Sequence, residues 1–170
     1  IVGGSQGAAI FDKIIPKSLN LLPYQIKKKL FIYHQCSKKN FDIVKKNYIK
    51  NKIKCSCRSF FNNLPDIMFK SKFIISRSGA STLSEIITLG KASILIPYKL
   101  AKNNHQVENA KWLERNKASV IIKEDKLTKE NLKNKILSFI KNKNILKKMS
   151  KNSFSLGDNM SLLKLSKLIY

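Results

Sequence analysis

A glycine-rich turn stands at the start of the chain, where Gly3-Gly4-Ser5-Gln6-Gly7-Ala8 follows only Ile1 and Val2. A turn that leaves a buried strand and opens a helix brings backbone N–H groups and the positive helix end together, and these can hold a diphosphate. The turn matches neither G-x-G-x-x-G nor a Walker A loop, so a tight turn without a ligand is the alternative. Since a full strand should precede it and no initiator Met does, we expect the front half of a longer protein to be missing.

A second loop that could bind an anion runs from Ser76 to Glu85, where a strand ends and Gly79 allows close approach of the backbone. Ser81 or Thr82 opens a helix, and the free N–H groups at its start form a second anion cradle that faces the first turn. A carboxylate at Glu85, one turn into the helix, can accept both hydroxyls of a ribose. Its alternative role is stabilisation of the helix dipole, worth about 0.3–1 kcal/mol.

Two more loops at expected strand ends carry polar or aromatic residues. In the segment 59–64, the aromatic residues Phe60 and Phe61 either pack on a base or begin a helix as core residues. In the segment 97–110, His105, Gln106 and Asn109 offer neutral donors and acceptors suited to sugar hydroxyls. No acid accompanies His105 in the way that base catalysis requires.

Short apolar runs alternate with helical patterns and would bring these loops to one edge of a sheet. The pattern predicts strands at 30–35, 53–57, 72–77, 92–97 and 118–123, and helices near 7–21, 39–50, 64–70, 81–89 and 104–116. Helices alone follow, over about 129–141 behind the cap Thr128, 143–150 and 158–169. Pro16 should kink or break the first helix, and Gly90 stands where a C-terminal glycine belongs. The alternation predicts an α/β fold, a Rossmann-like doubly wound parallel sheet forming one domain, with ligands at the carboxyl ends of the strands.

The composition agrees with a folded domain but leaves the role of its charge open. The chain has 170 residues, 43% of them hydrophobic, and a net charge of +24. Because only three of the basic residues are arginine and the lysines are spread throughout, compositional drift explains this charge at least as well as a nucleic-acid surface. The stretch from Lys129 to Lys151 is either a contact for anionic lipid or a solvated helix face. The three cysteines are interpreted as buried thiols, and no motif requires a metal.

Taken together, the loops resemble the C-terminal half of the family 28 glycosyltransferases that add N-acetylglucosamine to lipid I in peptidoglycan synthesis. The resemblance covers essentially the whole chain, and its motifs in this order and spacing are specific. They are Gly3–Ala8, His34-Gln35, Phe60, Arg77–Glu85, Gly90, Pro97-Tyr98, His105-Gln106 and Asn109-Ala110. The family has a GT-B fold of two Rossmann-like domains, so the resemblance implies that this chain is the donor-binding domain.

The resemblance implies that UDP-N-acetylglucosamine is the donor, and no motif of the sequence calls for a cofactor or a metal. The residues implied for this site are Ser5, Gln6, Gly7, Phe61, Arg77, Ala80, Ser81, Thr82, Leu83, Ser84, Glu85, His105 and Gln106. Ser5 would contact the diphosphate and sugar, and the backbone of Phe61 would read the uracil. Ala80 to Ser84 would line the diphosphate, Glu85 would bind the ribose, and Gln106 with His105 would select the sugar.

The resemblance also implies an inverting transfer to lipid I on the cytoplasmic face of the bacterial inner membrane. The acceptor site and the general base would lie in the absent N-terminal domain, so we assign no catalytic residue and expect the chain alone to transfer no sugar. The alternatives are the donor-binding subunit of a two-chain transferase, a nucleotide-sugar-binding module without catalysis, and a basic polyanion-binding protein.

Overall fold

The computed structural model describes residues 1–3, 8–101 and 104–169, with side chains as far as Gly157. Its strands are all parallel: β1 (Phe31–Gln35), β2 (Lys54–Arg58), β3 (Ile74–Ser76), β4 (Ser93–Leu95) and β5 (Ser119–Ile121). β1 pairs with β2, and β3, β4 and β5 pair in that order. Val2 forms parallel bridges to Gln35 on one side and to Ser76 on the other, which joins the two groups into one sheet.

The order across the sheet is therefore β2, β1, Val2, β3, β4, β5. From Val2 the chain proceeds outward in one direction through β1 and β2, and then in the other direction through β3, β4 and β5. This reversal is the topological switch point of a doubly wound fold, beside which ligands bind. Val2, which precedes the glycine-rich segment in the sequence, lies at this switch point.

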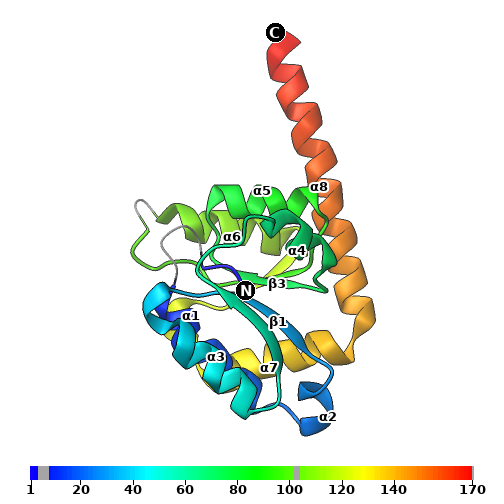
Figure 1. Ribbon diagram of the computed structural model, residues 1–170. Coiled ribbons are helices and arrows are strands. Elements are labelled where there is room, and N and C mark those ends of the chain that lie inside the picture. The colour runs from blue at the N-terminus through cyan, green and yellow to red at the C-terminus, as the bar shows by residue number, and fades with distance from the viewer. Residues whose placement is uncertain (4–7, 102–103, 170) are drawn as a thin grey trace.

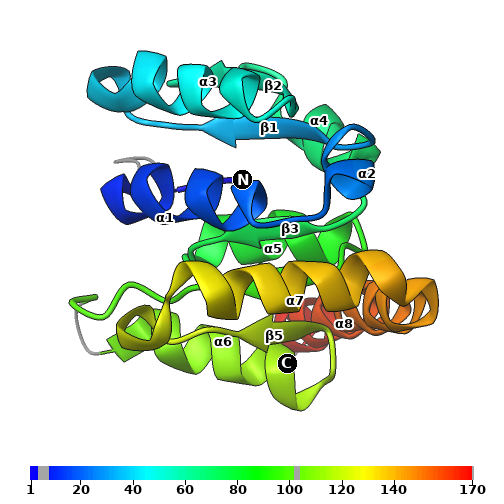
Figure 2. The ribbon, with the colours of Figure 1, turned by 90° about the horizontal axis from the view of Figure 1, so that it is seen from below.

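Helices cover both faces of the sheet (Figure 1). One face carries α1 (Ala9–Asn20), α3 (Phe41–Lys50) and α7 (Lys129–Lys141), and the other carries α4 (Leu64–Lys70), α5 (Ala80–Thr88) and α6 (His105–Arg115). Figure 2 shows the same layers from below, with the short helix α2 (Tyr24–Lys27) at the amino end of β1. The long helix α8 (Lys143–Ile169) packs on α5 and then projects from the body.

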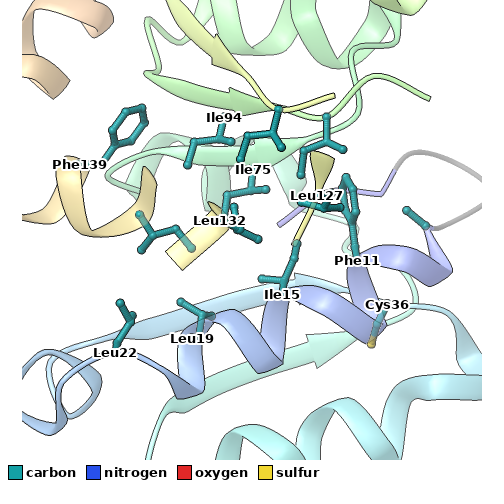
Figure 3. Close-up of a cluster of buried hydrophobic side chains, with 14 of the residues drawn as sticks. Phe11, Ile15, Leu19, Leu22, Cys36, Ile75, Ile94, Leu127, Leu132 and Phe139 are labelled. Carbon is teal, nitrogen blue, oxygen red and sulfur yellow. The ribbon is translucent and has the colours of Figure 1, made fainter. Parts of the chain in front are cut away.

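Each face of the sheet has its own apolar cluster. Side chains of α1, α7 and the strands fill the first, where Phe11, Ile15 and Leu132 meet Ile75 and Ile94 (Figure 3). The second lies under α5 and α6 and receives the neighbouring strand residues, Ile74 and Leu95. Successive strand residues point to opposite faces, so a sheet covered on both sides needs the nearly continuous apolar runs seen in the sequence.

The predicted strands and most helices are confirmed within one to a few residues at their ends. Gly90 follows the last residues of α5 with φ of 57°, the left-handed conformation that favours glycine at this position. The Thr128 hydroxyl oxygen accepts a hydrogen bond from the Asn131 backbone N–H at 3.1 Å and caps α7. Cys36 and Cys57 are buried free thiols.

The C-terminal helices were predicted wrongly as two separate segments, 143–150 and 158–169. They form one helix, because the residues between them pack against α5. The Ser153 hydroxyl donates to the Ile86 carbonyl at 3.2 Å, and Leu156 joins the second apolar cluster. A Cβ at Gly157 would lie 3.3 Å from Ile87 Cγ2, so glycine permits this close contact.

Pro16 was expected to kink or break the first helix, and the helix is not broken there. Pro16 is buried inside α1, which continues to Asn20. Ile15 and Leu19, on either side of it, are buried in the first apolar cluster, and this burial offsets the lost backbone hydrogen bond. The helix α2 was not predicted. Among the described residues, no helix is both long enough and apolar enough to cross a membrane.

Candidate functional site

The parallel strands bring the predicted binding loops to one edge of the sheet. Val2 lies between the ends of β1 and β3, since its N–H donates to the Ile75 carbonyl and its carbonyl accepts from the Arg77 N–H. The chain therefore leaves the sheet after Val2 beside the loop that leads into α5. Three of the predicted site residues, Ser5, Gln6 and Gly7, lie outside the described residues.

The start of α5 offers backbone N–H groups at this edge. Gly79 is the N-terminal cap, in an extended conformation with φ of −67° and ψ of 149°, and no side chain caps the helix there. Ala80, Ser81 and Thr82 form the first turn. A Cβ at Gly79 would meet no atom within 4 Å. Neither φ nor crowding by the described residues demands glycine here, so the open space is available to a ligand that approaches the backbone.

Thr82 and Glu85 lie on the same side of α5, three residues apart, and both are half-buried. Ser81 and Ser84 are exposed, whereas Leu83 is buried in the second apolar cluster. Partial burial raises the pKa of Glu85 above its usual range, because desolvation disfavours the carboxylate. A carboxylate that is partly removed from water forms stronger hydrogen bonds to hydroxyl donors than an exposed one does.

The loop after β2 separates its two aromatic residues. Phe61 is 6% exposed and meets the Tyr33 ring edge-on, with ring centroids 6.2 Å apart. Phe60 is 68% exposed. The Phe61 side chain is thus a core residue, and a ligand at this loop would meet backbone atoms of Phe61. Two pockets lie beside this loop, one between α4 and β2 and one toward α3, and Arg58 and Phe60 line both. Of the predicted site residues, only Phe61 is among those that line them.

The Arg77 side chain is buried and bonded to its own protein. Its Nη1 donates to the carbonyls of Ile96 and Pro97 at 3.1 and 3.3 Å and to Glu124 Oε2 at 2.8 Å. The same Glu124 oxygen accepts from the Lys99 backbone N–H at 3.2 Å. We call the ion pair of Arg77 and Glu124, together with the segment 96–99 whose backbone it holds by hydrogen bonds, the arginine clamp.

Aromatic rings complete this arrangement. The Arg77 guanidinium carbon lies 4.9 Å from the centroid of the Phe11 ring and 5.1 Å from that of Tyr98. The Tyr98 backbone N–H donates to Gln106 Oε1 at 3.0 Å. On either side of it along the backbone, the Pro97 carbonyl is hydrogen-bonded to Arg77 and the Lys99 N–H to Glu124. The loop after β4 therefore contacts the predicted sugar-binding side chain directly.

The first turn of α6 is tied to the residue that follows Arg77. The Ser78 hydroxyl donates to the Gln106 carbonyl at 2.7 Å, and the Asn109 side-chain amide donates to the Ser78 carbonyl at 3.1 Å. Gln106 is half-buried and His105 is exposed. Because a backbone N–H must face an acceptor, Tyr98 fixes the Gln106 amide with its oxygen inward and its NH₂ group as the donor for other partners.

A second buried polar group lies at the end of β1. Asp12 Oδ2 accepts from the Ser37 N–H at 3.2 Å, the Ser37 hydroxyl at 2.9 Å and the Asn40 amide at 3.0 Å. His34 Nδ1 lies 2.9 Å from the Tyr48 hydroxyl, and Nε2 lies 3.5 Å from Asp12 Oδ1, which is long for a hydrogen bond. Burial lowers the pKa of His34 to about 3, so the ring is neutral at pH 7. We call these five residues the aspartate cluster.

Sequence reasoning did not identify Asp12 or Glu124. The chain has only 10 acidic residues, so the places of these two were a usable signal. Asp12 falls near the start of an expected helix, and Glu124 follows directly after an expected strand. Their partners lie 22 to 47 residues away, at positions set by the strand order. The predicted groups on α5 and α6 do come together at one edge.

Comparison with known proteins agrees with this geometry. Residues 1–165 match the family model of the Glycosyltransferase family 28 C-terminal domain. The chain is 40% identical, over its whole length and 46% of the relative's, to the UDP-N-acetylglucosamine--N-acetylmuramyl-(pentapeptide) pyrophosphoryl-undecaprenol N-acetylglucosamine transferase of Buchnera aphidicola subsp. Schizaphis graminum. It is 34% identical to the enzyme of the same name from Wolbachia pipientis wMel, over 92% of this chain and 46% of the relative.

A solved structure gives the same result. The crystal structure of Acinetobacter baumannii MurG superposes with a TM-score of 0.78 at 26% identity, covering 91% of this chain and 44% of that one. The chain thus spans less than half the length of these relatives. The family match extends over nearly all residues, and the parallel sheet of the solved structure is shared. The chain belongs to glycosyltransferase family 28, as a MurG-like C-terminal domain.

Proposed function

We propose that the chain binds UDP-N-acetylglucosamine as the donor for transfer of N-acetylglucosamine to undecaprenyl-diphosphate-muramoyl-pentapeptide. The observation that carries this proposal is the start of α5, where Gly79 leaves open space before an uncapped helix N-terminus at the switch point. The positive end of a helix favours phosphate, and the backbone can be reached there. The relatives' names state the same donor and acceptor.

The donor would lie along the edge from the loop after β2 to the first turn of α6. Backbone atoms at Phe61 would meet the uracil, and Glu85 would accept the ribose hydroxyls. Ser5, Gln6, Gly7 and the segment 80–84 would surround the diphosphate, with Thr82 as a hydroxyl donor. The NH₂ group of Gln106 would donate to a sugar hydroxyl, with His105 nearby. N–H groups and the α5 dipole would stabilise the departing UDP.

Calorimetry with UDP-N-acetylglucosamine tests this proposal. The chain should bind this ligand, and Glu85→Gln should weaken binding about tenfold, because an amide replaces the ionised acceptor of two hydroxyls. Glu108→Gln is the matched control, since Glu108 is an exposed acid on α6 that pairs with Lys111. The proposal would be refuted if the chain bound neither UDP nor the UDP-sugar. We further expect no sugar transfer by the chain alone, which an assay with purified lipid acceptor would check.

We also propose an anionic membrane surface as a partner of the lysines between Lys129 and Lys151. Support comes from the exposure of many of them, among them Lys129, Lys141, Lys143 and Lys148, on the outer sides of α7 and α8. Co-sedimentation with vesicles containing phosphatidylglycerol should fall when three of these lysines are changed to alanine. The control is the same number of changes on α3, at Lys45, Lys46 and Lys50. An equal loss of co-sedimentation in both sets of variants would mean that the overall positive charge, and not this stretch, attracts the membrane.

A further inference from the structure

We propose that Arg77 and Glu124 are positioning residues that set the preference for UDP-sugar over UDP. This inference rests on the proposed function, because it concerns how the same site presents Gln106 to the donor. Neither side chain needs to touch the ligand. Their effect passes through the segment 96–99 to the Tyr98 N–H and from there to the Gln106 side chain.

The first step is the grip on the loop after β4. Arg77 and Glu124 hold successive backbone groups of this loop: the carbonyls of Ile96 and Pro97 through the guanidinium, and the N–H of Lys99 through the carboxylate. The two side chains are 10% and 12% exposed. Charged groups that are shielded from water hold their hydrogen-bond partners more firmly than exposed pairs do. The peptide planes on either side of Tyr98 are therefore fixed.

The second step is the orientation of Gln106. The Tyr98 N–H belongs to the same peptide group as the Pro97 carbonyl, which accepts from Arg77, and the Tyr98 ring lies against the guanidinium. This N–H donates to the side-chain amide oxygen of Gln106 at 3.0 Å. Without it, the amide can rotate by half a turn and present its oxygen, which cannot donate, in place of its NH₂ group. A loosened loop would thus weaken recognition of the sugar and spare the nucleotide.

The third step is that other contacts hold the helix itself. Ser78 and Asn109 tie the first turn of α6 to the end of β3 by hydrogen bonds that involve neither Glu124 nor the loop after β4. Loss of the clamp should therefore leave the Gln106 backbone in place. The predicted consequence is a change in the side-chain amide and in the selectivity that depends on it.

The test compares the affinities of the chain for UDP-N-acetylglucosamine and for UDP by calorimetry. In Glu124→Gln, which keeps the size but loses the charge, affinity for the UDP-sugar should fall about tenfold while affinity for UDP changes less than twofold. Arg77→Lys should act in the same direction, because an ammonium lacks the planar guanidinium that lies against the Phe11 and Tyr98 rings. Glu108→Gln, in an exposed ion pair on α6, should change neither affinity.

Each other outcome overturns the inference. Equal losses of both affinities in Glu124→Gln would show a merely structural role, and unchanged affinities would show no role. A wild-type chain that binds the UDP-sugar no better than UDP would leave Gln106 without a sugar contact to position. A wild-type chain that binds neither ligand would instead refute the proposed function, and the inference with it. If Arg77→Lys does not fold, Glu124→Gln decides alone.

Discussion

The aspartate cluster and the arginine clamp lie on either side of Val2, and they stabilise different parts of the molecule. Each contains a carboxylate with little exposure to water, that of Asp12 in the cluster and that of Glu124 in the clamp. Both also involve the first turn of α1, which holds Asp12 itself and Phe11, whose ring lies beside the Arg77 guanidinium. The cluster joins α1 to the loop after β1 through neutral donors. The clamp joins strand ends through a charge pair and reaches toward the exposed side chain of Tyr98. The difference indicates that the cluster serves folding, whereas the clamp serves the ligand.

The largest effect expected from this comparison is the loss of stability in Asp12→Ala. Removing the carboxylate leaves the N–H and hydroxyl of Ser37 and the amide of Asn40 without their acceptor. The free energy of unfolding should fall by about 3 kcal/mol, as for other buried charged acceptors. Urea unfolding measures this change.

The control for this variant is Asp42→Ala, an exposed acid in the first turn of α3, which should cost less than about 1 kcal/mol. Where Asp12→Ala still folds, its preference for UDP-sugar over UDP should match that of the wild type. A changed preference would break the division between a folding cluster and a ligand clamp.

The dependence of stability on pH should come in part from the same cluster. The pKa of His34 falls from 6.5 to about 3 on folding, mainly because burial disfavours the imidazolium. The unfolded chain therefore binds the extra proton between these values. Stability is fully present above pH 6.5 and is lost as pH falls toward 3, by at most about 1.4 kcal/mol per pH unit from this group.

Urea unfolding at pH 7, 6 and 5 checks this dependence. The slope should be smaller in His34→Gln, which has no titrating ring, than in the wild type. Equal slopes in the wild type and in His34→Gln would contradict a neutral buried His34.

A smaller effect is expected for Tyr48→Phe, which keeps the ring and removes only the hydroxyl beside His34 Nδ1. The ring is fully buried, so the nitrogen loses its partner with no water to replace it. Stability should fall by about 1 kcal/mol, and thermal unfolding would detect this. No loss in Tyr48→Phe would mean that the hydroxyl and imidazole do not bond in solution.

The sequence predicted those parts of the structure that depend on local pattern. The apolar runs located the strands, and glycine and polar residues at their ends located the edge where α5 and α6 begin. The continuity of α8 could not be predicted, because it depends on the contacts of Ser153 and Leu156 with α5. The ion pair of Arg77 and Glu124 joins residues 47 apart, and only the order of β3, β4 and β5 brings them together.

The smallest change in stability is expected for Gly79→Ala, on the clamp side of Val2. A methyl group there meets no atom of the described chain, and φ of −67° suits alanine. Alanine is a poorer N-terminal cap than glycine, but it also restricts the unfolded chain, and these effects of about 0.5 kcal/mol each nearly cancel. The unfolding midpoint should therefore stay within about one degree of the wild type. Affinity for UDP should nevertheless fall, because the methyl group occupies the space through which a diphosphate would approach the backbone. Unchanged UDP affinity would show that the open space at Gly79 is not part of the donor site.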